Sequence, residues 1–251
     1  MSVSIVIPSF ERPLLLGILL QSIKNQTFKN FEVIIVDDYS KNFAEIQKVV
    51  EPFKSAFPLT LIQNDKRSGA PVSRNKGIRL AKHELIALVD DDDEWFPEKL
   101  KCQIDLFEKS DDRTGLIYTW TMIVDPERNI LREDKGEIEG VAKREILQSC
   151  FIPSPSVMVR KKAIVEAGLF DESFPSCQDW DTWTRLIFKG YEVKVCRKFL
   201  TYYYKHGGPT IGTSPNAKKG FVKYYRKHFW KLLRYGQVRH LVRFFRLSTG
   251  L

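Results

Sequence analysis

The feature that most constrains this chain is the alternation of short apolar runs with helix-like segments over residues 3–110. Four apolar, β-branched runs, typical of buried parallel strands, cover residues 3–8, 31–38, 59–64 and 84–90. Segments with helical spacing follow them at residues 13–26, 43–54, 68–81 and 97–110. This alternation indicates βαβ units, so the sequence predicts an α/β fold with a mainly parallel central sheet flanked by helices.

Polar clusters follow three of the predicted strands, at residues 8–12 (PSFER), 37–40 (DDYS) and 90–95 (DDDDEW). Ligands bind beyond the carboxyl ends of parallel strands, so we expect these three loops to line one crevice. Neither GxGxxG nor GxxxxGK[ST] is present, which excludes the dinucleotide fingerprint and the P-loop. Closely set carboxylates instead suit a divalent metal that bridges a diphosphate.

The net charge of +9 is concentrated in the C-terminal part of the chain, because Glu192 is the last acidic residue and 14 of the 40 Lys and Arg residues lie beyond it. In the tail, residues 216–251, apolar residues recur at helical spacing: Phe221, Val222, Tyr225, Phe229, Leu232, Leu233, Val238, Leu241, Val242 and Phe245. A cationic, aromatic-rich amphipathic extension suits an anionic membrane surface. The alternative is that these helices pack on the catalytic domain.

Length and cysteine usage set further bounds. With 251 residues, the chain is long enough for one large domain with an appendage. The four cysteines, Cys102, Cys150, Cys177 and Cys196, form no CxxC pair, which argues against a zinc site and predicts reduced thiols in the cytoplasm. No apolar run approaches the roughly 20 residues of a membrane span, and the opening MSVSIVIPSF is strand-like, unlike a signal peptide.

Taken together and in order, six segments resemble the family 2 glycosyltransferases, whose fold is the Rossmann-like GT-A fold. They are VSIVIPSFER, QTFKNFEVIIVDDYS, GAPVSRNKGI, LIALVDDDDEWFPEKL, PSVMVRKKAIVEAGLFDESF and CQDWDTWTRL. The resemblance implies a GT-A domain over residues 1–215, with a nucleotide-binding half (1–110) and an acceptor-binding half (111–215), followed by the tail.

The resemblance also implies an activity. Such an enzyme transfers a sugar, with inversion, from a nucleotide-diphosphate sugar to a hydroxyl of a glycan or lipid-linked acceptor. We expect a UDP-sugar as donor, Mn²⁺ or Mg²⁺ as cofactor, and a role in bacterial polysaccharide or lipopolysaccharide biosynthesis. With the basic tail, this predicts a peripheral protein on the cytoplasmic face of the inner membrane.

Site residues on the donor side follow from the same resemblance. Asp38 matches the carboxylate that recognises the base, and Asp92, within the DxD motif, matches the metal ligand. His206 matches a histidine that some relatives place on the metal or diphosphate. The other expected nucleotide contacts are Pro8, Ser9, Phe10, Glu11, Arg74, Asp90 and Asp91.

On the acceptor side, Asp179 matches the catalytic base, which the chemistry requires because a sugar hydroxyl is a weak nucleophile until it loses its proton. Gln178 departs from the family pattern, which often has Glu there, and Asp181 is the fallback base. Because Asp181 lies two residues after Asp179 on the same predicted helix, its side chain would point to a different side of that helix from Asp179. Trp180, Asp181 and Trp183 are candidate acceptor contacts, although the two tryptophans also fit a core pair.

Two other classes remain open from the residues alone. A sugar-phosphate nucleotidyltransferase would also use metal-binding acids, but it normally has a Gly-rich loop after the first strand, and PSFERP has no glycine. A non-catalytic nucleic-acid-binding protein would explain the basic tail. It would leave the aspartate clusters unexplained, because acids beside a phosphate groove repel the ligand.

Overall fold

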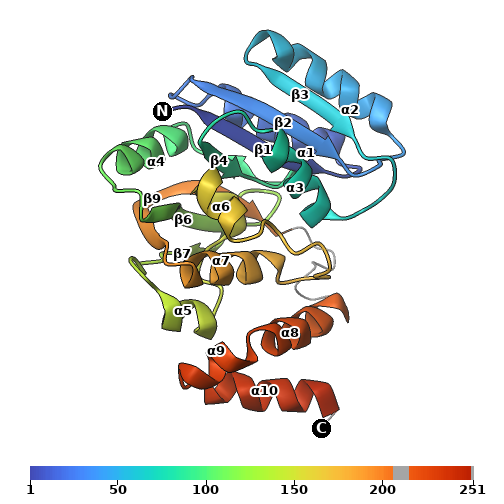
Figure 1. Cartoon of the computed structure of the whole chain (residues 1–251). Helices are drawn as coiled ribbons and strands as arrows, with labels where there is room; N and C mark the ends of the chain where they lie inside the picture. Colours follow the sequence, from blue (N-terminus) through green and yellow to red (C-terminus); the bar gives the residue numbers. More distant parts are fainter. Residues whose placement is uncertain (206–214, 250–251) are drawn as a thin grey trace.

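The computed structural model describes residues 1–205 and 215–249 and shows one mixed sheet with helices on both faces (Figure 1). The strands are β1 (Val3–Ser9), β2 (Phe31–Asp37), β3 (Leu59–Gln63), β4 (Leu85–Leu88), β5 (Glu94–Trp95), β6 (Thr114–Val124), β7 (Ile130–Asp134), β8 (Met158–Arg160) and β9 (Glu192–Tyr204). The α-helices are α1 (Pro13–Lys24), α2 (Phe43–Val50), α3 (Ala70–Leu80), α4 (Lys99–Glu108), α5 (Lys143–Gln148), α6 (Lys161–Glu166), α7 (Gln178–Phe188), α8 (Pro215–Lys227), α9 (Phe229–Arg234) and α10 (Val238–Thr249). Two 3-10 helices, η1 (Glu51–Ser55) and η2 (Ser154–Ser156), complete the set.

The sheet has the strand order β3-β2-β1-β4-β8-β6-β9-β5, and β7 pairs with β6. The first four strands are mutually parallel, while β8 is antiparallel to both β4 and β6. In the register of β1 and β2, Ser9 lies opposite Asp37, so the first two polar clusters leave the sheet side by side. The predicted α/β class is confirmed, and the four predicted strands coincide closely with β1 to β4.

Alternate residues of the inner strands fill two hydrophobic cores, one on each face of the sheet. Val3, Ile5 and Ile7 of β1 pack with residues of α1, α2 and α4, whereas Val6 packs on the side of α3, α6 and α7. Helix α3 lies very close to β1, since a Cβ added at Gly77 would come within 2.5 Å of Val6 Cγ1. The glycine therefore allows α3 to pack closely against the middle of β1.

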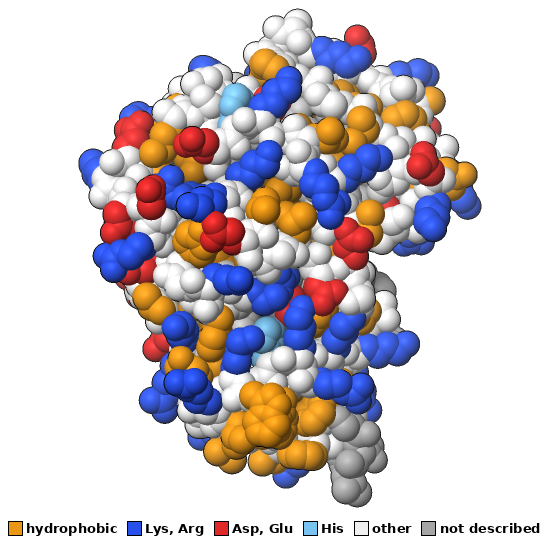
Figure 2. Space-filling model, viewed as in Figure 1, with side chains coloured by type: hydrophobic (Ala, Val, Ile, Leu, Met, Phe, Trp, Pro, Cys, Tyr) orange, Lys and Arg blue, Asp and Glu red, His pale blue; other side chains and the backbone are white. Residues whose placement is uncertain are grey.

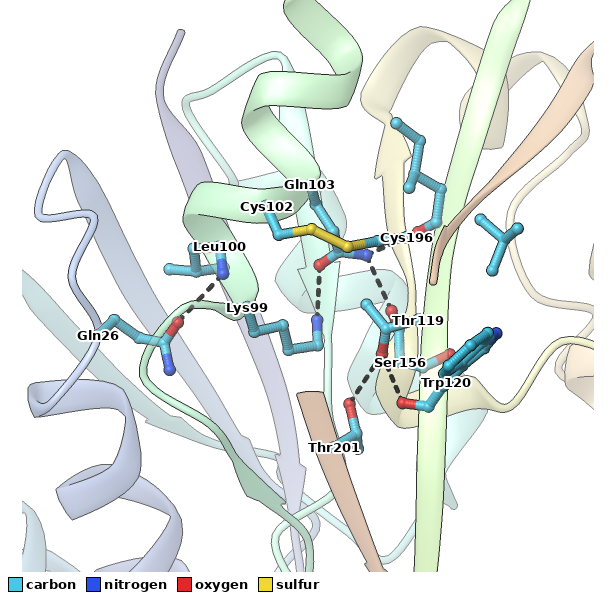
Figure 3. Close-up of a disulfide and its surroundings, with 12 residues drawn as sticks. Gln26, Lys99, Leu100, Cys102, Gln103, Thr119, Trp120, Ser156, Cys196 and Thr201 are labelled. Carbon is cyan, nitrogen blue, oxygen red and sulfur yellow. Dashed lines mark hydrogen bonds between the residues drawn. A yellow bond between two sulfur atoms is a disulfide. The ribbon is translucent and has the colours of Figure 1, made fainter. Parts of the chain in front are cut away.

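A disulfide joins Cys102 of α4 to Cys196 of β9 (Figure 3), so the prediction of reduced thiols is wrong for these two residues. The reason is tertiary: α4 packs along β9, although the two cysteines are 94 residues apart in sequence. Beside the disulfide, the Gln103 side chain donates to the carbonyls of Ile117 and Ser156 at 2.7 and 2.9 Å. Cys150 and Cys177 are free.

The tail forms three helices, α8 to α10, that lie beneath α7 at the end of the molecule farthest from β3 (Figure 1). Tyr224, Tyr225 and Leu232 have no exposed surface and belong to the core that α7 shares. Part of the apolar face predicted for membrane contact therefore packs on the domain, as in the alternative considered for the tail, while Leu233, Val238, Val242 and Phe245 stay exposed. None of the helices in the described part of the chain combines the length and apolarity needed to cross a membrane.

Candidate active site

The acidic loop after β4 is tied to two other segments at the same edge of the sheet. Asp91 accepts a hydrogen bond from the backbone N–H of Phe10 at 2.9 Å. The Arg12 guanidinium, which follows β1, lies 3.1 Å from Asp91 and 2.6 Å from Asp92. Asp90 pairs with Nη2 of Arg74, on α3, at 2.5 Å. The convergence expected from the sequence is therefore present for the first and third polar clusters, and the second is joined to the first, since the Asp38 N–H donates to the carbonyl of Ser9 at 2.8 Å.

Two of the crowded carboxylates of this loop, Asp91 and Asp93, hold protons more tightly than ordinary aspartates. Burial and the negative charge of Asp92 raise the pKa of Asp91 to about 7. The hydrogen bond from the backbone N–H of Phe10 acts in the opposite direction. Burial and the charges of Asp92 and Asp90 raise the pKa of Asp93 well above its usual range. A bound cation would offset this repulsion, so the loop is electrostatically suited to one.

The donor set of the loop also fits a catalytic metal. Asp91 and Asp92 converge on one cation, the Arg12 guanidinium. Across residues 1–205 and 215–249, no three His, Cys, Asp or Glu side chains form a closed metal cage. Mg²⁺ is typically held by one or two carboxylates together with substrate phosphates, which matches this arrangement. The predicted ligand His206 lies outside the described residues.

The segment after β1 supplies an aromatic ring and a cation. The Arg67 guanidinium lies 4.3 Å from the centroid of the Phe10 ring, which is partly exposed. Glu11 has a positive φ of 54° and donates its backbone N–H to Ser40 Oγ at 2.8 Å, which turns the chain away from the strand. Pro8 and Ser9 are buried in β1, so of the four predicted base-pocket residues Phe10 and Glu11 are the accessible ones.

Asp37 and Asp38 both stabilise the loops around them. Asp38 accepts the backbone N–H groups of Ser68 and Gly69, both at 2.8 Å, and the Asn64 side chain at 3.1 Å. Asp37 accepts from Ser40 and from the side chain of Gln63. With three donors on Asp38, the structure assigns it a role in holding the loop before α3, and contact with a base stays a prediction.

Asp179 lies at the wall of a cavity with a volume of about 550 Å³ that also exposes Asp90 and Arg74. It stands in the first turn of α7, is partly exposed, and accepts the backbone N–H of Trp180 at 2.9 Å. Desolvation raises the pKa of Asp179, while the charge of Arg74 acts in the opposite direction. A carboxylate with a raised pKa that faces a cavity is suited to accept a proton.

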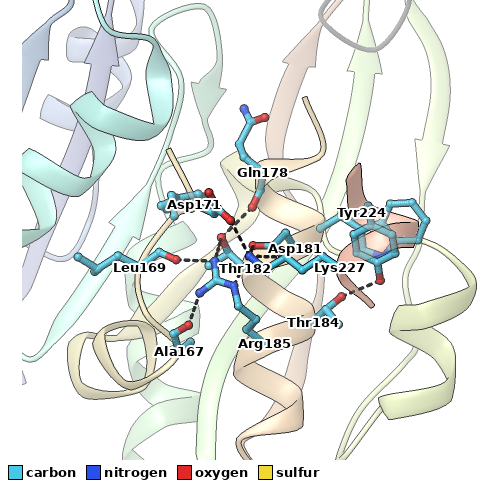
Figure 4. Close-up of polar contacts among 12 residues, drawn as sticks. Ala167, Leu169, Asp171, Gln178, Asp181, Thr182, Thr184, Arg185, Tyr224 and Lys227 are labelled. Atoms are coloured by element: carbon cyan, nitrogen blue, oxygen red, sulfur yellow. Dashed lines mark hydrogen bonds and ion pairs between the residues drawn. The ribbon is translucent and has the colours of Figure 1, made fainter. Parts of the chain in front are cut away.

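Asp181 and Trp183 point away from this cavity, and their predicted acceptor contacts are corrected. Asp181 is fully buried and pairs with Arg185 at 2.8 Å, Lys227 at 3.0 Å and His228 at 2.9 Å. Figure 4 shows this cluster between α7 and α8. Trp183 has no exposed surface and packs edge-on against Phe170. Neither side chain can contact an acceptor in this arrangement, and Asp181 is not available as a fallback base.

Trp180 lines the cavity but offers little surface to a sugar. It is 5% exposed, its ring stacks on Tyr224 at 3.9 Å between centroids, and its indole N–H donates to the carbonyl of Ile146 at 2.5 Å. The core alternative considered for this residue describes it better than the sugar platform. Its contacts fix the start of α7, and with it the position of Asp179.

Several residues that reach the site were not among its predicted residues. Arg12 belongs to the PSFER cluster, and its position after the first strand could have indicated it. Phe221 and Ala217 of α8 and His240 and Arg243 of α10 line the cavity of Asp179. No local pattern assigns these four to the site, because their placement depends on how the tail folds back onto α7.

Comparison with known proteins gives a consistent result. The sequence profile described as Glycosyl transferase family 2 matches residues 4–167. A putative colanic acid biosynthesis glycosyl transferase of Escherichia coli (strain K12) is 30% identical over 232 residues, which cover 90% of this chain and 81% of that protein. The GalNAc(5)-diNAcBac-PP-undecaprenol beta-1,3-glucosyltransferase of Campylobacter jejuni is 27% identical over 229 residues, 88% of this chain and 71% of that one.

Solved structures agree on the fold. S. aureus TarS in complex with UDP-GlcNAc superposes with a TM-score of 0.77 at 20% identity, covering 100% of this chain and 73% of that chain. A mannosyltransferase from Pyrobaculum calidifontis in complex with GDP-Man and Mn2+ gives a TM-score of 0.68 at 18% identity, covering 90% of this chain and 64% of that chain. The family match favours the glycosyltransferase interpretation over the nucleotidyltransferase and nucleic-acid-binding alternatives.

Proposed function

Because the chain belongs to glycosyltransferase family 2, we propose that it is an inverting, metal-dependent hexosyltransferase that takes its sugar from a nucleotide-diphosphate sugar. A UDP-sugar is the proposed donor. The partly exposed Phe10 ring and Arg67 stand beside the acidic loop, where a base and its diphosphate would lie next to each other. TarS, which has the same fold, was solved with UDP-GlcNAc.

One observation carries the proposal: Asp179, partly exposed, shares a cavity with Asp90 and Arg74. In the proposed reaction Asp179 removes the proton from the acceptor hydroxyl, whose oxygen attacks the anomeric carbon opposite the leaving diphosphate. A single displacement of this kind inverts the anomeric centre. Asp91 and Asp92 would hold Mn²⁺ or Mg²⁺, which when bound supplies charge neutralisation for the leaving diphosphate.

The test separates donor binding from transfer. Asp92→Asn should abolish metal-dependent binding of UDP-sugars, measured by calorimetry with Mn²⁺. Asp179→Asn should bind the donor as the wild type does and lose transfer. Asp112→Asn, at a fully exposed carboxylate, is the matched control and should change neither. Transfer by Asp179→Asn at near wild-type rate would remove the proposed base.

A role in bacterial cell-surface polysaccharide or lipopolysaccharide assembly is part of the same proposal. It is supported by the Escherichia coli relative, named for colanic acid biosynthesis, and by the Campylobacter jejuni relative, named for a lipid-linked acceptor. A glycan or lipid-linked acceptor would be met at the cytoplasmic face of the inner membrane, where the basic tail would hold the enzyme.

The outer face of the tail is the proposed membrane contact. Although Tyr224, Tyr225, Leu232 and Leu241 of the tail are buried, α9 and α10 keep an exposed apolar patch, made of Trp230, Leu233, Val238, Val242 and Phe245. Figure 2 shows apolar side chains gathered at this lower end of the molecule with Lys and Arg nearby. Aromatic and aliphatic side chains ringed by cations suit insertion into an anionic lipid interface.

Vesicle sedimentation tests the membrane contact. The double variant Trp230→Ser/Phe245→Ser should lose pelleting with phosphatidylglycerol vesicles, because it removes the two largest exposed rings of the patch. Leu14→Ser is the matched control, since Leu14 is 79% exposed on α1, away from the tail. Equal pelleting of the double variant and the wild type would refute this part of the proposal.

A further inference from the structure

The cavity beside Asp179 has one wall that the catalytic domain does not provide. On one side stand Arg74 of α3 and Asp179 of α7, and on the other Phe221 of α8 with His240 and Arg243 of α10. The tail helices lie directly beneath α7 in Figure 1. Removing the tail would therefore take away part of the lining of this cavity.

Buried contacts fix this wall in place. The Tyr224 hydroxyl lies 2.9 Å from Thr184 Oγ1 of α7, and its ring stacks on Trp180. Lys227, the last residue of α8, pairs with the buried Asp181 (Figure 4). His228, which follows it, pairs with the same carboxylate. Because Tyr224, Asp181 and His228 are buried, these contacts hold α8 to the same helix that carries Asp179. The distance between the base and the tail wall is thus set by the fold.

Arg243 is the charged group of the wall. Its guanidinium lies 4.5 Å from the centroid of the Phe221 ring and contacts the hydroxyl of Tyr225. The residue is exposed, and within the part of the chain that the structure describes no carboxylate forms an ion pair with it. His240, one turn earlier, has Nδ1 3.2 Å from the Tyr225 hydroxyl, and burial and Arg243 lower the pKa of its ring.

The opposite side of the cavity also offers an unused donor. Arg74 is 4% exposed, and its Nη1 has no hydrogen-bond partner among the described residues, although Nη2 is bonded to Asp90. A buried guanidinium N–H without a hydrogen-bond partner destabilises the fold unless a bound ligand accepts that hydrogen bond. The remaining cation in the lining, Arg132, is already paired with Asp134 at 3.3 Å. Arg74, with a buried N–H donor left over, and Arg243, without an ion-pair partner among the described residues, are therefore the two guanidinium groups of the lining best placed to bind an anion.

We propose that the C-terminal helices form the acceptor-binding wall, and that Arg243, supported by the Phe221 ring, binds an anionic group of the acceptor. This rests on the proposed function and names the class of acceptor: a saccharide that carries a phosphate or a carboxylate. The planar fork of a guanidinium matches both groups, and stacking on an aromatic ring leaves its N–H edge available. A volume of about 550 Å³ is sufficient for a sugar unit with such a substituent.

The experiment measures binding of three probes to the full chain with UDP and Mn²⁺ present, by saturation-transfer NMR. Glucose 1-phosphate and para-nitrophenyl glucuronide carry the two anionic groups, and para-nitrophenyl glucoside is neutral. Arg243→Gln should weaken the preferred anionic probe about tenfold or more, since a charged hydrogen bond contributes roughly 1.5–3 kcal/mol. Its affinity for the neutral probe should not change.

Arg246→Gln is the matched control, because it removes the same charge from an exposed position of α10 that does not line the cavity. It should leave all three affinities unchanged. Preference for the phosphate or for the glucuronide identifies which anion the wall recognises. The proposal is overturned if Arg243→Gln weakens neutral and anionic probes equally, if it weakens none, or if no anionic probe binds the wild type at millimolar concentration. UDP-sugar binding, measured separately, reports on the proposed function itself.

Discussion

Asp181→Asn is the substitution that most sharply tests how the tail is joined to the catalytic domain. The Asp181 carboxylate is fully buried and is the shared partner of Arg185, Lys227 and His228. Although burial opposes ionisation, the hydrogen bond from His228 and the charge of Arg185 hold the pKa of Asp181 below its usual range. Its ionised form therefore stabilises the folded state above the ordinary aspartate pKa, and this stability is lost as pH falls through the folded-state pKa.

The magnitude follows from the burial of the pair. Removing one partner of a buried ion pair leaves the other charges uncompensated and costs about 3–5 kcal/mol. For a chain of this size, each kcal/mol shifts the melting temperature by roughly 2–4 °C, so Asp181→Asn should lower it by about 6–20 °C. Asp171 is the matched control, because it binds the same Lys227 at 2.7 Å but its side chain is 28% exposed. Asp171→Asn should cost about 1 kcal/mol or less.

Urea unfolding at neutral pH gives the free energies, and differential scanning calorimetry gives the melting temperatures. The two variants should be ranked clearly, with Asp181→Asn the less stable. At acidic pH the difference between wild type and Asp181→Asn should shrink, because the wild-type carboxylate becomes protonated. A loss of stability in Asp181→Asn no larger than in Asp171→Asn would refute the view that this carboxylate fastens the tail.

Three further predictions concern protons and thiols. The acid limb of the pH–rate profile should lie above the ordinary aspartate pKa of about 3.9, because Asp179 must be ionised and its pKa is raised. Arg74→Gln should move the limb to still higher pH, because it removes the charge that lowers this pKa. A limb at or below the ordinary value would contradict the assignment of Asp179 as the base. Burial holds the pKa of Lys99 well below its usual range, so the unfolded state binds more protons than the folded state. The free energy of unfolding of the wild type should therefore rise from neutral pH toward about pH 10. In denaturation curves measured in parallel, Lys99→Met should not show this rise. Thiol titration of the unfolded, unreduced protein should detect two groups, Cys150 and Cys177, and four would show that the disulfide is absent.

The first half of the fold could be predicted because its signals are local. Each of the strands β1 to β4 is an apolar run followed by a segment with helical periodicity, and this pattern needs no knowledge of distant residues. The bounds and partners of the long strand β9 were not predicted, since it mixes charged and aromatic residues and is only partly buried. Without β9, the partner of Cys102 could not be identified either.

The site was predicted in part for the same reason. The acidic loop and Asp179 could be found from strand ends and from the family resemblance, whereas the roles of Asp179 and Asp181 depend on what faces each side of α7. The sequence indicates that the two side chains point in different directions, but not which direction meets the cavity. Burial in the tail is equally hard to predict. Tyr225 of α8 is buried and Trp230 of α9 is exposed, and only the packing of the tail on α7 decides which apolar residues are covered.

The most direct test of the central claim is a crystal structure of the protein with UDP and Mn²⁺. The account predicts the pyrophosphate beside the Asp90–Asp92 loop, with the metal bound by Asp92, the uracil near Phe10, and Asp179 across the cavity from the terminal phosphate. A nucleotide bound elsewhere, with the acidic loop in contact with neither metal nor phosphate, would contradict it.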